Sequence, residues 1–185
     1  MDFYNPEPYS IIKEPWMLDY ILTQCKLKED QAHLCSHVKS NKLEIDLNTE
    51  KGSLILDHLK DAVYPYGKPV VDYWMKEYNP GQYAAMHYDG FYEAEQVLYS
   101  TSILIESNNV EGGEYIMGSD FNYNTHKWLK HRLKYYNVKT PGLGISWTQF
   151  TYHGITEITS GVRKTLMVAK KSDMLWKDIE NVEEK

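Results

Sequence analysis

Cysteine is scarce in this sequence of 185 residues. Its two cysteines, Cys25 and Cys35, are too few for a disulfide framework, and no Cys-x-x-Cys pair is present. The N-terminal segment MDFYNPEPYS lacks the basic start and the apolar run of a secretory signal. No stretch approaches the ~18 apolar residues of a membrane span. We therefore expect a cytoplasmic protein with reduced thiols and no membrane segment.

A surplus of basic charge is also missing, because 26 acidic residues outnumber 20 basic ones and the formal net charge is -6. Proteins that bind nucleic acids neutralise phosphates and normally have a basic footprint. The charge balance therefore argues against a nucleic-acid partner. We interpret one local group of basic residues as a solvated surface. This group consists of Lys127, Lys130, His131, Arg132 and Lys134.

Hydrophobic residues, by contrast, make up 42% of the chain and aromatic residues 14%, which is enough to build the core of one domain. Residues 15–35 and 51–62 have apolar side chains at helical spacing, so we expect two helices in an N-terminal support that spans residues 1–65. Residues 66–172 contain short strand patterns separated by turn signals, and residues 173–185 form an acidic tail. This order predicts a mostly β fold, a sandwich or jelly roll backed by N-terminal helices.

The clearest strand patterns are rich in β-branched and aromatic residues. They cover residues 70–78, 98–106, 145–153 and 162–171. The segment 119–137 is polar, aromatic and basic, and we treat it as an insertion in the sheet. Its stretch WLKHRLKYY is a candidate helix.

A His-x-Asp pattern, His87 and Asp89, follows the turn signal NPGQ. Residues two apart in a strand project to the same face, so this imidazole and this carboxylate can share one cavity. His153, in the later strand ISWTQFTYH, can supply a third ligand. Two histidines and one carboxylate on one side of an ion form the facial triad of non-haem Fe(II) sites, which leaves positions open for O2 and a co-substrate.

Arg163 and Thr165 come later, in the stretch SGVRKTLMV. If TEITSG turns the chain, Arg163 lies on the strand next to that of His153. A guanidinium can form a bidentate pair with a carboxylate, and Thr165 can add a hydroxyl on the same face. This combination suits a ligand with a chelating end and a distant carboxylate, such as 2-oxoglutarate.

Three stretches together resemble the Fe(II)/2-oxoglutarate dioxygenases of the prolyl 4-hydroxylase-like group. They are EYNPGQYAAMHYDG, STSILIESNNVEGGEY and PGLGISWTQFTYHGITEITSGVRKTLMV. The likeness runs from about Val70 to Ala169. It implies a double-stranded β-helix (jelly-roll) core, an iron site at the two histidines and the aspartate, and a 2-oxoglutarate site at Arg163.

Tyrosines distinguish this chain from the group that it resembles. Tyr78 matches a tyrosine of the group that lies near 2-oxoglutarate. The group often has a second tyrosine on the strand after His-x-Asp, but here Ile105 lies near that position. Thr165, Tyr99 and Tyr78 are then the candidates for the missing hydroxyl donor.

The resemblance implies a hydroxylase that uses Fe(II), 2-oxoglutarate and O2, with ascorbate as a candidate reductant, and releases succinate and CO2. We expect a prolyl residue in a protein or peptide as the substrate. A free amino acid or another small metabolite is the first alternative, and a non-catalytic metal-binding jelly roll is the alternative from another class. Tyr88, Tyr92 and Trp147 are the candidate substrate residues, and the loop 90–97 and the insertion are candidate lids.

The other histidines offer no second metal site. His33 and His37 have helical spacing but no third ligand on their face, so we interpret them as part of a helix surface. We interpret His58 as structural, and His126 and His131 as surface residues.

Overall fold

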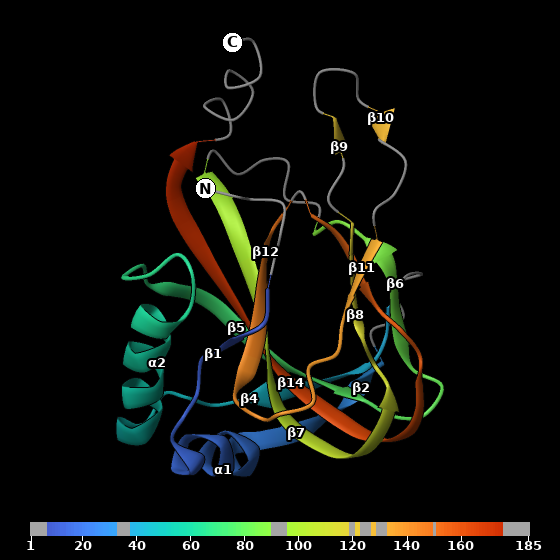
Figure 1. The fold of residues 1–185 in the computed structure, drawn as a ribbon. Coiled ribbons are helices and arrows are strands. Elements are labelled where there is room, and N and C mark those ends of the chain that lie inside the picture. The colour runs from blue at the N-terminus through green and yellow to red at the C-terminus, as the bar shows by residue number, and fades with distance from the viewer. Residues whose placement is uncertain are drawn as a thin grey trace.

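Strands account for most of the described chain, which comprises residues 7–32, 38–89, 96–118, 121–122, 127–128, 133–149 and 151–175 of a computed structural model. Figure 1 shows the elements along the chain. They are β1 (Tyr9–Ser10), α1 (Pro15–Gln24), β2 (Cys25–Ala32), β3 (Val38–Lys39), β4 (Asn41–Ile45), α2 (Glu50–Ala62), β5 (Val70–Tyr78), β6 (Tyr83–His87), β7 (Gln96–Gly112), β8 (Tyr115–Gly118), β9 (Phe121–Asn122), β10 (Lys127–Trp128), β11 (Leu133–Tyr136), β12 (Leu143–Thr148), β13 (Tyr152–Ile155) and β14 (Ile158–Leu175).

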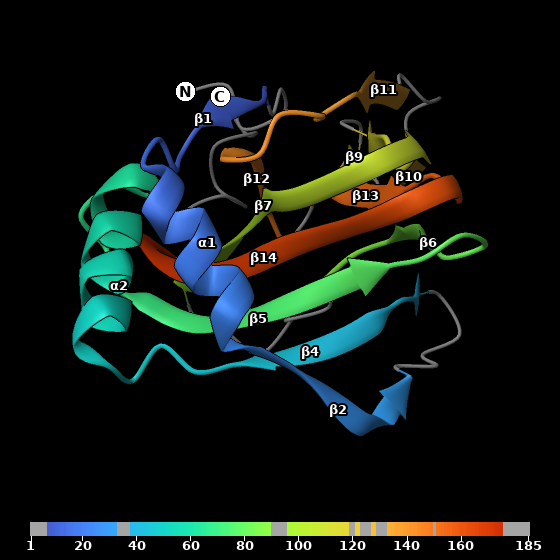
Figure 2. The same cartoon turned by 90° about the horizontal axis from the view of Figure 1, so that it is seen from below.

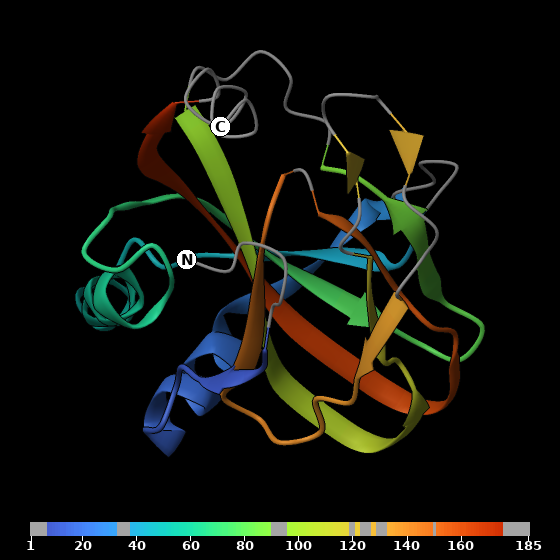
Figure 3. The ribbon, with the colours of Figure 1, turned by 45° about the horizontal axis from the view of Figure 1, so that its top comes forward.

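Antiparallel pairing joins these strands into two main sheets and one hairpin. The larger sheet has seven strands in the order β1-β12-β7-β14-β5-β4-β2, and the smaller has five in the order β11-β8-β13-β6-β3. Figure 3 shows the sheets on either side of the interior, with β7 (yellow-green) and β14 (red-orange) in one and β6 (green, right) in the other. This architecture confirms the predicted mostly β, jelly-roll fold.

Both helices cover the outer face of the larger sheet (Figure 2). α2 starts after Thr49, whose hydroxyl oxygen accepts a hydrogen bond from the backbone N–H of Gly52 at 3.0 Å. Ile55 and Leu59 follow one turn apart and are both buried. Within the described residues, no helix has both the length and the apolar character needed to cross a membrane. The buried residues of this outer cluster are Ile11, Ile12, Met17, Ile21, Leu43, Leu47, Ile55, Leu59, Val63, Met75, Ile103, Ile105, Leu166 and Val168.

A second apolar cluster fills the space between the two sheets. Successive residues of a strand point to opposite faces, so Leu166 and Val168 of β14 belong to the outer cluster whereas Met167 belongs to the inner one. Arg163 and Thr165 alternate in step with Met167 and therefore face the interior. The buried residues of the inner cluster are Val38, Tyr78, Ala84, Leu104, Tyr115, Met117, Tyr136, Val138, Ile145, Trp147, Ile155, Ile158 and Met167.

The predicted helix over residues 15–35 is too long. α1 ends at Gln24, and β2 follows and pairs with β4, with Cys25 opposite Ile45 and Leu27 opposite Leu43. The N-terminal support is therefore strand as well as helix. Pairing with an edge strand decides this, because the apolar residues after Gln24 are too few to form a second helical face. α2, by contrast, confirms the predicted helix over residues 51–62.

The candidate helix in the insertion is also wrong where the structure describes it. Lys127–Trp128 is strand β10, which pairs with β9, and Leu133–Tyr136 is strand β11, which pairs with β8 of the smaller sheet. Tyr136 is buried in the inner cluster, and this tertiary contact outweighs the local helical pattern. His126, His131 and Arg132 lie outside the described residues.

The stretch 145–153, predicted as one strand, is two strands in different sheets. β12 pairs with β7 in the larger sheet, and β13 pairs with β6 and β8 in the smaller one. The chain thus changes sheets between Thr148 and Tyr152. As a result Trp147 and His153 face each other across the interior, with ring centroids 4.6 Å apart.

Replacing Lys170 by alanine is expected to lower the free energy of unfolding by about 2–4 kcal/mol. Lys170 is fully buried on β14, and its Nζ donates to the backbone carbonyls of Lys60 at 2.7 Å and Val63 at 2.6 Å, at the C-terminal end of α2. The variant leaves these carbonyls without a donor from this side chain. Urea denaturation measures the change, and Lys171→Ala, an exposed neighbour, is the matched control. Equal stability of the two variants would contradict this capping role.

Candidate metal centre

Three potential metal ligands converge between the sheets. His87 ends β6, Asp89 follows it, and His153 on β13 is the direct cross-strand partner of His87. Oδ1 of Asp89 lies 3.5 Å from Nε2 of His153 and 4.0 Å from Nε2 of His87. One ligand atom from each residue lies within 4.8 Å of the others. The predicted triad residues are therefore brought together in a group that could hold a metal ion.

The backbone fixes which nitrogen of each histidine faces this group. Nδ1 of His87 lies 2.7 Å from the carbonyl oxygen of Ala85, and Nδ1 of His153 lies 2.9 Å from that of Thr151. A carbonyl only accepts, so Nδ1 of each ring must bear the proton and donate it. In the neutral ring, Nε2 then has the lone pair, and in both residues Nε2 is the nitrogen that faces Asp89, as metal-ligating histidines require.

The protonation states of the buried pair also suit a cation. Burial lowers the pKa of His153 to about 4, although the charge of Asp89 opposes the shift. Burial alone would raise the pKa of Asp89, but His153 and the donors Ser100 and Trp147 outweigh this and hold the pKa below its usual range. At neutral pH His153 is neutral and Asp89 is ionised. Metal binding at His153 and Asp89 therefore has no proton to displace.

Arg163 lies in the sheet opposite the triad. The sequence predicted Arg163 on the strand next to that of His153, and this is wrong, because β14 pairs with β5 and β7 of the larger sheet. Arg163 faces the triad's sheet across the interior because a jelly roll sends successive strands to alternate sheets. Its side chain is 2% exposed, and its Nη1 donates to the carbonyl oxygen of Gly113 at 2.6 Å. Its guanidinium carbon lies 4.7 Å from the ring centroid of Tyr115.

Two donors of this guanidinium have no partner in the part of the chain that the structure describes. Among the described residues, Nε and Nη2 of Arg163 are buried without a hydrogen-bond acceptor, and so is the hydroxyl of Thr165. Buried donors are almost always satisfied, and an unsatisfied charged donor costs more than a neutral one. Donors arranged in this way fit the carboxylate of a ligand, which accepts bidentate bonds from a guanidinium.

Gly113 makes room for Arg163. Its φ of 72° is a conformation that favours glycine. A Cβ at this position would lie 2.5 Å from Cδ1 of Ile158 and 3.4 Å from Nη1 of Arg163. The Gly-Gly turn thus holds an acceptor against the guanidinium without blocking it.

The candidates for a second hydroxyl donor have different positions. Tyr78 is the cross-strand partner of Arg163 and faces the interior beside it. Tyr99 points to the outer side, where its ring lies 4.8 Å from that of Tyr64, so it is not available to the interior. Ile105 is the extra residue of a bulge and belongs to the outer cluster. Leu104 is the inward-facing residue there, opposite Thr165.

Tyr115 is a residue of the candidate site that the sequence did not predict. It is buried between the sheets, and its hydroxyl lies 2.7 Å from Oγ of Ser102. Two hydroxyls bonded to each other share one hydrogen, so the pair keeps one O–H to donate elsewhere. The only signal in the sequence is its place two residues after the Gly112-Gly113 turn. Nothing in the periodicity shows that this ring lies against Arg163.

The candidate substrate residues have different surroundings in the structure. Tyr88 is half-buried, and its ring packs against that of Tyr152 at 5.2 Å. Trp147 is 5% exposed and donates its indole N–H to Asp89, so it supports the triad instead of lining an open pocket. Tyr92 lies outside the described residues, as do His33 and His37.

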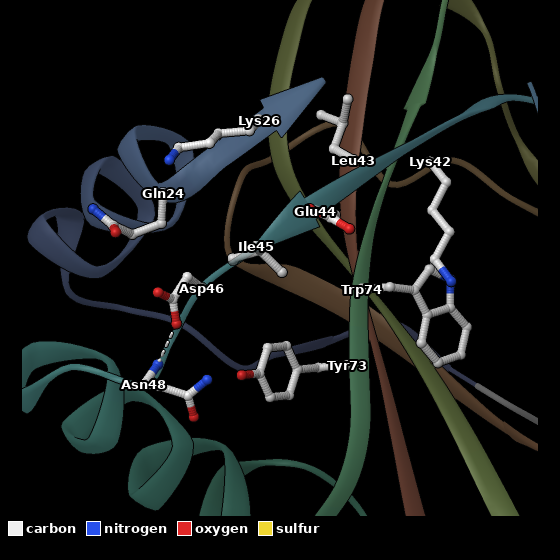
Figure 4. A pocket seen from close by; sticks show the side chains of 10 residues that line it. All are labelled: Gln24, Lys26, Lys42, Leu43, Glu44, Ile45, Asp46, Asn48, Tyr73 and Trp74. Carbon is white, nitrogen blue, oxygen red and sulfur yellow. Dashed lines mark hydrogen bonds between the residues drawn. The ribbon is translucent and has the colours of Figure 1, made fainter. Parts of the chain in front are cut away.

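A hollow of about 570 Å³ lies away from the triad, beside β4 and β5 of the larger sheet (Figure 4). It forms where β4 diverges from β5, beyond the last register pair of Leu43 and Met75. Its lining includes both acids and bases but none of the triad residues. Within the described chain, we therefore take the triad and not this hollow as the candidate functional site. The lining residues are Gln24, Lys26, Lys42, Leu43, Glu44, Ile45, Asp46, Asn48, Tyr73 and Trp74.

Sequence comparison identifies no relative: no family model matches the chain, and no curated protein matches it. Structural comparison, in contrast, finds proteins of similar fold. The chain has the fold of the prolyl hydroxylase-like 2OG-Fe(II) oxygenases.

Three solved structures illustrate this similarity of fold. A prolyl-4-hydroxylase of Pseudomonas putida has a TM-score of 0.59 and 10% identity, over 92% of this chain and 94% of that one. The viral collagen prolyl hydroxylase of Paramecium Bursaria Chlorella virus-1, in its 2OG complex, has a TM-score of 0.57 and 15% identity, over 90% and 96%. A prolyl hydroxylase of Trichoplax adhaerens, in complex with a hypoxia inducible factor peptide fragment, has a TM-score of 0.58 and 7% identity, over 93% and 85%.

Proposed function

We propose that this protein is an Fe(II)- and 2-oxoglutarate-dependent dioxygenase that hydroxylates a C–H bond and releases succinate and CO2. The observation behind this proposal is the pairing of two sites across one interior. The triad of His87, Asp89 and His153 lies on the smaller sheet, and the unsatisfied donors of Arg163 lie on the larger one. Each suits a different end of 2-oxoglutarate.

Each residue has a distinct task in this proposal. The two Nε2 atoms and Oδ1 of Asp89 would hold Fe(II), a set of two histidines and one carboxylate that suits an iron that reacts with O2. The bound iron supplies O2 activation, coupled to decarboxylation of 2-oxoglutarate. Arg163 orients the co-substrate through its distal carboxylate, with Tyr78 and Thr165 on the same face of the sheet. The buried inner cluster excludes water from these groups.

For the substrate we propose a prolyl residue in a protein or peptide. Support comes from the fold, which is that of prolyl hydroxylases, one of them bound to a peptide fragment. Tyr88 and Tyr92 are the substrate-contacting candidates that this proposal keeps. We further propose that the whole chain forms one oxygenase domain in the cytoplasm, with ascorbate as a reductant that maintains Fe(II).

The first test is anaerobic titration of the purified protein with Fe(II) and 2-oxoglutarate. The proposal expects the visible charge-transfer absorption of the iron chelate, followed by succinate release when air and prolyl peptides are added. No absorption from folded, metal-loaded protein would overturn the 2-oxoglutarate assignment. Absorption without succinate from any prolyl peptide, amino acid or metabolite would favour the non-catalytic metal-binding jelly roll.

Replacing Tyr115 by phenylalanine is expected to raise the Kd for 2-oxoglutarate about tenfold, because one hydrogen bond to a charged group is lost. The hydroxyl pair of Tyr115 and Ser102 lies beside Arg163 and has one O–H to spare. The Kd is measured from the charge-transfer absorption. Tyr99→Phe, which alters a buried tyrosine on the outer side, should leave it unchanged. An unchanged Kd in Tyr115→Phe would remove this tyrosine from the co-substrate site.

A further inference from the structure

The two oxygens of the Asp89 carboxylate have different surroundings. Oδ2 accepts hydrogen bonds from Oγ of Ser100 at 2.7 Å and from Nε1 of Trp147 at 2.9 Å. Oδ1 is the oxygen that faces Nε2 of His87 and of His153. The two donors therefore occupy the lone pairs of one oxygen, and the other is left to the proposed metal.

Both donors come from one place in the opposite sheet. Trp147 on β12 and Ser100 on β7 are direct cross-strand partners, and they are 5% and 7% exposed. Asp89, in contrast, follows the end of β6 in the smaller sheet. Because Asp89 lies beyond the end of the strand, the backbone hydrogen bonds of the sheet do not restrain its side chain. Its orientation therefore depends on the larger sheet.

Trp147 also touches a second ligand. Its ring lies 4.6 Å from that of His153, at an interplanar angle of 39°. A buried indole N–H needs an acceptor, and here the acceptor is Oδ2 of Asp89. One side chain thus restrains the carboxylate through a hydrogen bond and the imidazole through ring packing.

We infer that Trp147 and Ser100 are positioning residues of the metal centre. Together they direct Oδ1 of Asp89 to the metal and keep the carboxylate from rotating or binding through both oxygens. The inference rests on the proposed function, since it assumes that the triad binds a divalent cation. Hydrogen-bond partners of metal ligands typically contribute a factor of ~10–100 to metal affinity.

The test is the Kd for Mn²⁺, measured on metal-free protein from the electron paramagnetic resonance signal of the unbound ion. Trp147→Phe keeps an aromatic ring beside His153, although a smaller one, and removes the N–H donor to Asp89, so we expect a Kd that is about 10–100-fold higher. Ser100→Ala should raise it about tenfold, and Ser100→Thr, which keeps a hydroxyl, should restore it.

Thr101→Val is the matched control. Thr101 is the next residue of the same strand, is also buried, and its hydroxyl bonds to Oγ of Ser146 at 2.7 Å instead of to Asp89. Its removal should leave the Mn²⁺ Kd unchanged. Tight Mn²⁺ binding by the wild type together with unchanged affinity in both Trp147→Phe and Ser100→Ala would overturn the inference. A wild type that binds no Mn²⁺ would instead overturn the proposed function.

A purely structural role predicts a different result. In that case Trp147→Phe would lower the Tm of the metal-free protein, while the rise in Tm on adding Mn²⁺ would equal that of the wild type. The inference expects the opposite pattern, a smaller metal-induced rise, because stabilisation by a ligand falls as its Kd increases. An equal rise in both proteins would count against a positioning role.

Discussion

His153→Ala is expected to abolish divalent-metal binding and, with it, any 2-oxoglutarate turnover. His153 is the most buried of the three ligands, and its removal leaves Asp89 and His87 without the third atom that completes the triad. The loss should exceed the ~100-fold that changes around a metal site typically cause, because a ligand itself is lost. Mn²⁺ binding followed by paramagnetic resonance, and succinate release, measure the two effects.

His58→Gln serves as the control for this variant. His58 lies on α2, outside the triad, and its Nε2 bonds to the carbonyl oxygen of Ile11 at 2.7 Å. It should bind Mn²⁺ as the wild type does. Wild-type metal affinity in His153→Ala would show that the triad is not the metal site.

Arg163→Met is expected to weaken 2-oxoglutarate binding by about 3 kcal/mol, roughly a hundredfold in Kd, and to leave metal affinity nearly unchanged. The guanidinium is buried on the sheet opposite the triad, with Nε and Nη2 free for a carboxylate among the described residues. Methionine keeps apolar volume against Tyr115 but has no donor. Titration of the Mn²⁺- or Fe(II)-loaded protein with 2-oxoglutarate measures the change.

Lys164→Met is the matched control, because it removes a positive charge from the next residue of the same strand. Lys164 points outward and pairs with Glu106 at 2.7 Å, with a quarter of its side chain exposed. Its removal should not alter the Kd for 2-oxoglutarate. Arg163→Lys should bind less tightly than the wild type, since an ammonium cannot form a bidentate pair. A Kd in Arg163→Met equal to that of the control would remove Arg163 from the co-substrate site.

The sequence predicted those parts of the site that depend on local alternation. β5 has the bounds expected from its Val-, Tyr- and Trp-rich pattern. His87 and Asp89 share a face, as residues two apart in extended chain do. Arg163 and Thr165 do so as well, and both are buried. A period of two needs no knowledge of the partner strand.

Contacts across the interior could not be predicted in this way. Nothing in the alternation of ISWTQFTYH shows that the chain changes sheets between Trp147 and His153. A bulge next to the triad, where Ile155 pairs with Ala84 although His153 pairs with His87, changes which residues of β6 face inward. Trp147 could therefore be predicted as an interior aromatic but not as a partner of Asp89.

Helical spacing failed where edge strands formed. Residues 25–32 have few apolar residues and residues 133–136 are a short stretch, and their structure comes from pairing with β4 and β8 rather than from their own pattern. Propensity is a weak guide at such positions because a partner strand can override it. The prediction of a jelly roll was confirmed because the long central strands β7 and β14 are rich in the β-branched and aromatic residues that favour strands.

Because the site is divided between two sheets, the spacing of the sheets sets the distance between the triad and the guanidinium of Arg163. Packed sheets lie ~10 Å apart, and this spacing depends on the side chains of the inner cluster and not on any loop. Under the proposed function, a co-substrate must reach from the triad on one sheet to the guanidinium on the other. The inner cluster would thereby select among dicarboxylates by the number of carbons between their ends. Substitutions of inner residues outside both groups, such as Met167 or Ile145, would change this selectivity by changing the thickness of the core.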